Sequence, residues 1–415
     1  MSLPQLILHL VAQYALILVV AHAFGRLFLR IGQPSVVGMM VAGVCLGPSV
    51  LGHLAPAAQA WCFPVETLDI LRWGAQVGVG LYLFSTGLEF DLGLVASRTR
   101  AAVSVSLAGI AMPFLLAWPL ARMLAGRPGL FPAHVSDWQE VVFLGAAIAI
   151  TAFPMLVWIV RERGLAGTPM GAMAITAGAV DDAFAWCFLA LVVSSLSGDP
   201  SQVLLAVGGA AALALFARHL GRSALAPLTD AVERAGRVGP AHLAAMLAVL
   251  AAFLGFSEWI GLHAVFGGFV CGLCLPRGRL NDWLRARLDP LVGPFLLPLF
   301  FTFSGLSTRL DLVFSAEGLA VFGLVLLVSV MGKGVACWGA ARLAGMDNRS
   351  ALGIGALMNA RGLMELILLG IGLRAGIVGP LLFSVLVLMA IATTFAATPL
   401  FNWLGPKGET KDERR

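Results

Sequence analysis

Thirteen apolar segments follow one another along this chain, separated by short polar loops. An apolar stretch of about 20 residues is long enough to cross the hydrocarbon core of a bilayer as a helix. Hydrophobic residues make up 59% of the 415-residue sequence and charged residues only 12%, which excludes a soluble domain. We therefore predict an all-α polytopic membrane protein with thirteen transmembrane helices. The segments are residues 4–25, 33–51, 67–88, 101–125, 138–160, 169–196, 201–219, 240–260, 263–275, 288–308, 316–341, 349–373 and 376–404.

Arginine and lysine residues are distributed unevenly between alternate loops. If the N-terminus lies outside, 20 of the 27 fall in inside loops or in the C-terminal tail, and 5 fall in outside loops. Cytoplasmic loops of membrane proteins carry an excess of basic residues. We therefore predict a multi-pass protein of the cell (inner) membrane, with its N-terminus outside and its C-terminus in the cytoplasm. The two remaining cations, Lys333 and Arg361, lie inside apolar segments.

An internal repeat is visible in the second and ninth segments. VGMMVAGVCL at residues 37–46 matches FGGFVCGLCL at residues 266–275. The copies are seven segments apart, and an odd offset reverses the orientation of a membrane helix. We predict two inverted six-helix repeats joined by the seventh segment. Inverted repeats that contain broken helices are typical of secondary transporters.

Two segments that correspond under this repeat are both interrupted. The fifth contains Thr151-Ala152-Phe153-Pro154, and the twelfth contains Met358-Asn359-Ala360-Arg361-Gly362. Proline and glycine break helices, and the lipid interior tolerates broken backbone only where it lines a cavity or is buried in protein. We expect two crossing broken helices whose half-helix ends present unpaired carbonyls and amides, with oxygens supplied by Thr151 and Asn359.

Two adjacent carboxylates, Asp181 and Asp182, occupy the middle of the sixth segment. A charge at the centre of a membrane helix costs roughly 2.5–3.5 kcal/mol, so such a pair points to function. Neighbouring side chains on a helix diverge by about 100°, so one can face a cavity and the other a neighbouring helix. Lys333 lies about 13 Å inside its segment, too deep to reach the interface, and needs a carboxylate partner. Asp181 is the candidate.

Arg361 and Glu365 are four residues apart, a spacing that places them on one side of a helix. We expect this pair to neutralise the dipole ends at the crossing and to tie it together.

Several motifs together resemble those of the cation/proton antiporter-2 family, which has the sodium/proton antiporter fold. The resemblance extends to about Leu404. Three places depart from the family: Met39 stands where a glutamate is common, Asp181 where many members have asparagine, and Val157-Trp158 where Ala-Arg usually follows. The motifs are Ile31-Gly32-Gln33-Pro34, Leu46-Gly47-Pro48-Ser49, Thr86-Gly87-Leu88-Glu89-Phe90-Asp91-Leu92, Thr151-Ala152-Phe153-Pro154, Glu258-Trp259-Ile260-Gly261-Leu262 and Met358-Asn359-Ala360-Arg361-Gly362-Leu363-Met364-Glu365.

The resemblance implies roles for these residues. Asp182 binds the ion and the proton, Asp181 pairs with Lys333, and the monovalent cation has Asp182, Asp181 and Thr151 as ligands. Asn359, Arg361, Glu365, Pro154 and Gly362 support the crossing. It also implies a homodimer, with a scaffold at residues 1–96 and 238–312 and a transport core at 97–198 and 313–404. Residues 199–237 are a linker helix and a cytoplasmic loop, and 405–415 a short tail.

The function expected is secondary antiport of Na⁺ or K⁺ against protons. Cation and proton compete for the Asp pair, access to the site alternates between the two faces, and the exchange is electrogenic. The alternatives are a potassium efflux pathway, electroneutral K⁺/H⁺ exchange and a membrane sensor that kept the fold. The sequence shows no phosphate loop, zinc spacing or nucleophile constellation, so we expect neither an enzyme nor a cofactor. It has no basic tract with interleaved aromatics, so nucleic acid is not an expected partner, whereas the lipid bilayer is.

Overall fold

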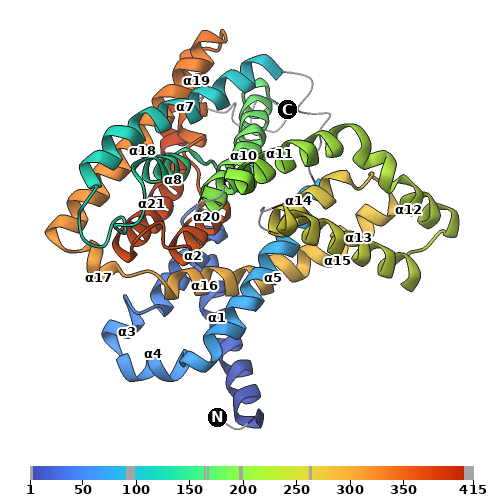
Figure 1. Ribbon diagram of the computed structural model, residues 1–415, viewed down its shortest axis with the longest axis horizontal. Helices are drawn as coiled ribbons and strands as arrows, with labels where there is room; N and C mark the ends of the chain where they lie inside the picture. Colours follow the sequence, from blue (N-terminus) through green and yellow to red (C-terminus); the bar gives the residue numbers. More distant parts are fainter. Residues whose placement is uncertain are drawn as a thin grey trace, which may run out of the picture. The chain divides into compact units, whose positions relative to one another are not determined.

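The computed structural model describes residues 3–89, 99–162, 165, 168–195, 200–260 and 264–405. Some helical side chains, those of Pro154 and Asp182 among them, fall outside the description. Within the described part every regular element is a helix (Figure 1). The elements are α1 (Leu3–Arg30), α2 (Ser35–Leu46), α3 (Leu51–Leu54), α4 (Pro56–Cys62), α5 (Val65–Glu89), α7 (Thr99–Leu124), α8 (Asp137–Ala149), α9 (Phe153–Glu162), α10 (Pro169–Ser195), α11 (Pro200–Phe216), η1 (Ala217–Gly221), α12 (Arg222–Ala235), α13 (Pro240–Trp259), α14 (Ala264–Cys274), α15 (Arg279–Leu291), η2 (Val292–Leu296), α16 (Leu297–Leu306), α17 (Leu310–Val313), α18 (Ala316–Leu343), α19 (Asn348–Leu357), α20 (Leu363–Arg374) and α21 (Pro380–Leu404).

Every apolar segment of the sequence overlaps one or more of these helices. In the described part of the chain, seven helices are long and apolar enough to cross a membrane. The fifth segment is divided between α8 and α9, and the twelfth between α19 and α20. The all-helical membrane fold is therefore confirmed, whereas the number of crossings and the inverted relation of the halves remain predictions.

Two long helices, α12 and α15, lie mostly in stretches where the sequence predicts loops, as do the short helices α3, α4 and α17. α12 occupies the polar stretch after the seventh segment, and α15 runs without interruption through η2 into α16, so the tenth segment begins earlier than predicted. α15 is amphipathic: Leu280 and Leu284 are buried one turn apart, while Arg287 stacks over the ring of Trp283 at 3.8 Å. A search for continuous apolar runs misses such half-polar helices.

The chain forms two compact units, each built from segments far apart in sequence. Unit 1 comprises residues 1–27, 38–93 and 189–308, and unit 2 comprises residues 28–37, 94–188 and 309–415. The roles of scaffold and transport core are predictions that these units do not test.

Glycines allow close backbone approaches in unit 1. A side-chain carbon at Gly87 would overlap the backbone of α14, and one at Gly272 would overlap the backbone of α5. Gly43 of α2 and Gly305 of α16 form a second such contact. Small residues at helix crossings are how membrane helices pack without a hydrophobic driving force.

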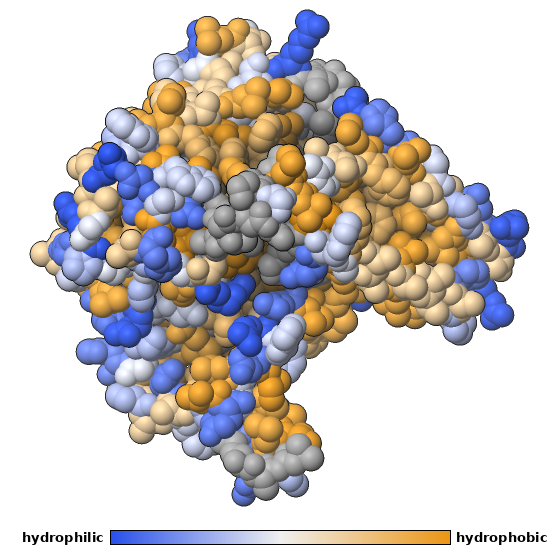
Figure 2. Space-filling view, in the orientation of Figure 1, coloured by the Kyte–Doolittle hydropathy of each residue, from blue (hydrophilic) through white to orange (hydrophobic). Residues whose placement is uncertain are grey.

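The outer faces of the unit 1 helices are apolar. Leu204, Leu215, Leu247 and Trp259 are exposed on α11 and α13. Figure 2 shows mainly hydrophobic side chains over the region around α13, with hydrophilic ones gathered near α12. Such surface suits contact with lipid and not with water.

Unit 2 carries the candidate site. In it α18 packs against α7 and α19, α7 against α8, and α19 against α21. A continuous apolar core joins these elements and includes Leu156, Ile159, Ala174, Ile354 and Leu357, none of which is measurably exposed.

Candidate functional site at two broken helices

The first break separates α8 from α9 at Ile150–Ala152. Pro154 is the second residue of α9, and proline has no N–H that could donate to the carbonyl of residue 150 in a continuous helix. α8 therefore ends inside the protein, where its last four carbonyls have no partner within the helix.

The second break separates α19 from α20, and the two breaks are bonded to each other. The Ala152 N–H donates to the Ala360 carbonyl at 2.9 Å, and the Thr151 hydroxyl donates to the Met358 carbonyl at 2.7 Å. Gly362 directly precedes α20 as its N-cap residue, and a side-chain carbon there would come within 3.0 Å of Met155. Each break thus supplies the hydrogen bonds that the other lacks.

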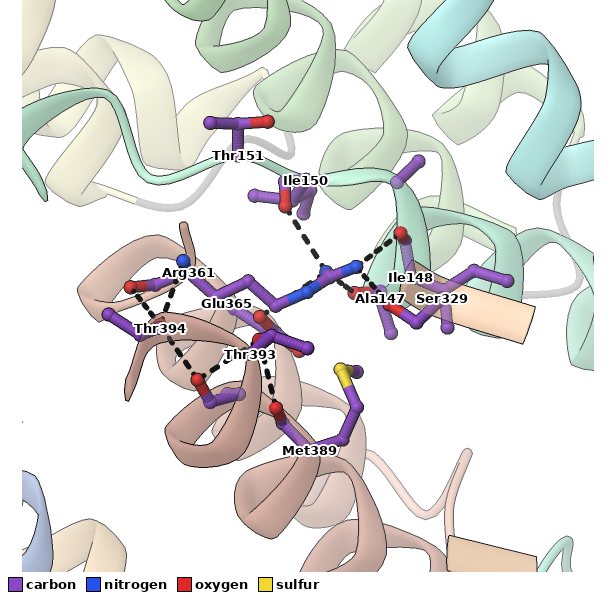
Figure 3. A network of polar contacts seen from close by, with 12 residues as sticks. Ala147, Ile148, Ile150, Thr151, Ser329, Arg361, Glu365, Met389, Thr393 and Thr394 are labelled. Atoms are coloured by element: carbon purple, nitrogen blue, oxygen red, sulfur yellow. Dashed lines mark hydrogen bonds and ion pairs between the residues drawn. The ribbon is translucent and has the colours of Figure 1, made fainter. Parts of the chain in front are cut away.

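Arg361 caps the end of α8 (Figure 3). Its guanidinium donates to the Ala147 carbonyl at 2.7 Å, the Ile148 carbonyl at 2.5 Å and the Ile150 carbonyl at 3.2 Å, and it also contacts the Ser329 hydroxyl of α18. The side chain is fully buried. A cation at a helix C-terminus complements the negative end of the helix dipole while it satisfies orphan carbonyls.

Thr394 of α21 fixes the backbone of Arg361 (Figure 3). Its hydroxyl accepts from the Arg361 N–H at 2.9 Å and lies 2.8 Å from the Arg361 carbonyl. Glu365, in the first turn of α20, lies 3.4 Å from the guanidinium, farther away than the two nearest carbonyls. The carbonyls of α8 are therefore the main partners of Arg361, and the Arg361–Glu365 pair is the longer contact.

Lys333 and Asp181 form a second buried ion pair. Lys333 Nζ lies 2.5 Å from Asp181 Oδ2, and the ammonium also contacts the Ala149 carbonyl and, at 3.4 Å, the Gly109 carbonyl. The Ser106 hydroxyl of α7 donates to Asp181 Oδ1 at 2.5 Å. Both oxygens of this carboxylate are thus engaged, and all three ammonium protons have acceptors.

The end of α8 is consequently held by two cations. Arg361 donates hydrogen bonds to the carbonyls of Ala147, Ile148 and Ile150, and Lys333 donates one to the carbonyl of Ala149. Among the described side chains, four charged ones are at most 2% exposed: Asp181, Lys333, Arg361 and Glu365. Their formal charges cancel, as buried charges must unless an ion neutralises them.

Asn359 belongs to the second break and is 3% exposed. Its amide nitrogen donates to the Gly355 carbonyl at 2.9 Å, one turn back in α19. Its oxygen has no hydrogen-bond partner among the described residues.

Two residues predicted for the site fall outside the described side chains. Asp182 lies in α10 directly after Asp181, and Pro154 lies in the first turn of α9. The roles predicted for them remain predictions.

Three hydroxyl residues of the site were not found from the sequence: Ser106, Ser329 and Thr394. Each lies within an apolar helix, where serine and threonine commonly bond to the preceding turn of their own helix. No sequence signal separates these from other hydroxyl residues, and only the approach of a distant charge or broken backbone identifies them.

Comparisons with known proteins extend this picture. The family model described as "Sodium/hydrogen exchanger, transmembrane" matches residues 15–404. The Na(+)/H(+) antiporter NhaS4 of Synechocystis sp. is 35% identical over 401 residues, which are 95% of this chain and 96% of that protein. The K(+)/H(+) antiporter 1 of Saccharomyces cerevisiae is 30% identical over 95% of this chain but 46% of its own length. This chain thus spans about half the length of the yeast relative, and likewise of Cation/H(+) antiporter 19 of Arabidopsis thaliana.

One solved structure shares the fold. The sodium proton antiporter MjNhaP1 from Methanocaldococcus jannaschii superposes with a TM-score of 0.60 over 96% of both chains. At 14% sequence identity this likeness concerns the fold alone.

Proposed function

This chain belongs to the sodium/hydrogen exchanger family, and from that premise we propose that it is a secondary antiporter exchanging a monovalent cation, Na⁺ or K⁺, for protons. Relatives named as Na(+)/H(+), K(+)/H(+) and Na(+)/H(+)-K(+) antiporters support both cations. The buried site in unit 2 is suited to this task because broken backbone and ionised side chains meet there away from solvent.

Asp182 is the group for which cation and proton compete. The observation that carries this assignment is the engagement of its neighbour: Asp181 has one oxygen bonded to Ser106 and the other to Lys333. Since the four described buried charges cancel, an ionised Asp182 adds one negative charge to the site. One monovalent cation or one proton neutralises it, which makes the two mutually exclusive.

Transport proceeds by alternating access. The transport core is the predicted pair of stretches 97–198 and 313–404, and it moves against the scaffold at 1–96 and 238–312. We place the chain in the inner membrane as a homodimer, with the N-terminus outside and the C-terminus in the cytoplasm. The excess of basic residues in alternate loops supports the orientation.

We propose electrogenic exchange of about two protons for one cation, the second proton coming from Lys333 or the coupled Asp pair. The second candidate is one-for-one, electroneutral exchange. One observation favours it: the Lys333 ammonium is engaged by Asp181 and by the carbonyls of Ala149 and Gly109, as in a structural ion pair.

Flux measurements in proteoliposomes test the proposal. With Na⁺, K⁺ or Li⁺ offered in turn, an outward proton gradient should drive cation uptake, and collapse of the gradient should stop it. Uptake that persists without a counter-gradient would instead identify a potassium efflux pathway. An imposed diffusion potential should change the rate of electrogenic exchange, since each charge moved across 100 mV corresponds to about 2.3 kcal/mol. A rate indifferent to voltage would establish one-for-one exchange.

A further inference from the structure

The Asn359 oxygen is a buried acceptor that the surrounding protein leaves unused. The residue is 3% exposed, and Oδ1 has no hydrogen-bond partner in the described part of the chain. A buried polar atom without a partner costs free energy, and native structures keep few of them. An unpartnered acceptor at the break between α19 and α20 is therefore a candidate ligand for a bound ion.

The orientation of this amide is fixed by its other end. Nδ2 donates to the Gly355 carbonyl at 2.9 Å, and a side-chain carbon at Gly334 would come within 2.9 Å of the same nitrogen. If the amide were flipped, its oxygen would face the Gly355 carbonyl, and the two acceptors would repel each other. Oδ1 is therefore the free end, and it belongs to a side chain that packs against α18 at Gly334, the residue after Lys333.

The other side-chain oxygen predicted at the breaks is in a different situation. The Thr151 hydroxyl donates its hydrogen to the Met358 carbonyl and so bonds one break to the other. The Asn359 side chain donates only to Gly355, in the last turn of α19, and its carbonyl-type oxygen has no partner among the described residues. Oxygens of this type replace the hydration shell of alkali cations in membrane proteins.

We propose that Asn359 Oδ1 is a ligand of the transported cation and that it helps to set the preference among Li⁺, Na⁺ and K⁺. The inference rests on the proposed antiport at Asp182 and adds a neutral ligand to that charged one. The amide does not change the charge of the site, so it strengthens cation binding without holding a proton. It thereby favours the cation in the competition with the proton.

Two substitutions separate ligation from structural support. Asn359→Leu keeps the branching and the number of side-chain heavy atoms and removes the oxygen, whereas Asn359→Asp keeps an oxygen and adds charge. In proteoliposomes, Asn359→Leu should raise the KM for Na⁺ at least tenfold and lower the maximal rate much less. Asn359→Asp should lower the KM for Li⁺ and Na⁺ more than that for K⁺, because the attraction of a charged ligand grows as the ion becomes smaller.

A matched control removes another buried acceptor. Ser257 of α13 in unit 1 is fully buried, and its hydroxyl also has no partner in the described part of the chain. Ser257→Ala should leave every KM unchanged. The same purified proteins can be heated with and without 100 mM NaCl: the wild type and Ser257→Ala should be stabilised by Na⁺, and Asn359→Leu should lose that stabilisation.

The outcomes are distinct. An unchanged KM and an unchanged Na⁺ stabilisation in Asn359→Leu would overturn the inference and leave a bound water as the partner of Oδ1. If Asn359→Leu does not assemble, Asn359→Asp decides: a KM that falls by the same factor for all three cations shows a charge acting from a distance, and it too overturns the inference. Failure of the proposed function would appear separately, as exchange that survives in Asp182→Asn.

Discussion

The two units treat charge in opposite ways. In unit 2, Asp181, Lys333, Arg361 and Glu365 are buried around helices that stop inside the protein. In unit 1 the described ion pairs keep solvent contact, as in the pair of Arg285 and Glu89, which are 37% and 38% exposed. An uninterrupted helix satisfies its own backbone and needs no buried cation, whereas a helix that ends at depth does. Burial of charge therefore marks the broken backbone, and with it the site.

The largest effect on transport is expected from substitution of Asp182, in unit 2. Asp182→Asn should abolish exchange in proteoliposomes, because the amide carries neither the negative charge that attracts a cation nor a titratable proton. The control is Asp69→Asn, the same change at a carboxylate of unit 1 that is 79% exposed. It should transport at the wild-type rate, and near-normal exchange by Asp182→Asn would refute the site assignment.

Loss of the Arg361 guanidinium should be the largest effect on stability. Arg361→Met leaves three carbonyls of α8 unpaired and Glu365 without its counter-charge. Removing one member of a buried, bonded charge pair typically costs about 3–5 kcal/mol. Thermal unfolding of the purified protein in detergent, measured without added cation, should show the loss. A variant as stable as the wild type would mean that α8 does not depend on this cap.

A more moderate effect on transport is expected at Gly362. A leucine there would press on Met155 and Ala152, which lie 3.0 and 3.3 Å from the position of the new side-chain carbon. We expect Gly362→Leu to lower the exchange rate about tenfold and to leave the amount of assembled protein much less affected, since the crossing must keep its half-helix ends open to the ion.

Gly339 on α18 provides the comparison for Gly362. A side-chain carbon there meets nothing within 4 Å, so Gly339→Leu should transport normally. Equal rates for the two leucine variants would show that the crossing tolerates filling.

The smallest effect is expected in unit 1. A double-mutant cycle with Arg285→Met and Glu89→Gln should give a coupling of about 0.2–1 kcal/mol, the usual value for solvent-exposed pairs. Raising the ionic strength should reduce it further. A coupling as large as the loss in Arg361→Met would remove the distinction between the two units.

The parts of the site that could be predicted are those in which a residue would be unfavourable in a membrane helix without a partner. Lys333 in an apolar segment requires a nearby carboxylate, and the structure places Asp181 beside it. The breaks at Thr151–Pro154 and Met358–Gly362 were visible because proline or glycine stands there beside polar residues, in segments that correspond under the internal repeat; proline or glycine alone does not mark a break, since Pro113 and Pro119 lie inside α7.

The parts that could not be predicted depend on distant partners. The i,i+4 spacing points from Arg361 to Glu365, whereas the shorter contacts run to carbonyls more than 200 positions away, and a carbonyl has no sequence signature. Ser106 could not be distinguished from other serines in apolar helices. α15 was missed for a related reason, since its buried stripe is only one side of a basic helix.

The bonds between the breaks also constrain the order in which the protein can be assembled. The first break receives its partners from Met358 and Ala360, which the ribosome adds about 200 residues later. Arg361 in turn has its backbone bonded by Thr394, in the last helix. The first half of the chain is therefore synthesised before the break between α8 and α9 has its hydrogen-bond partners. A nascent chain that stops before α19 leaves the polar backbone of the first break without these partners, and one that stops before α21 leaves the backbone of Arg361 without Thr394.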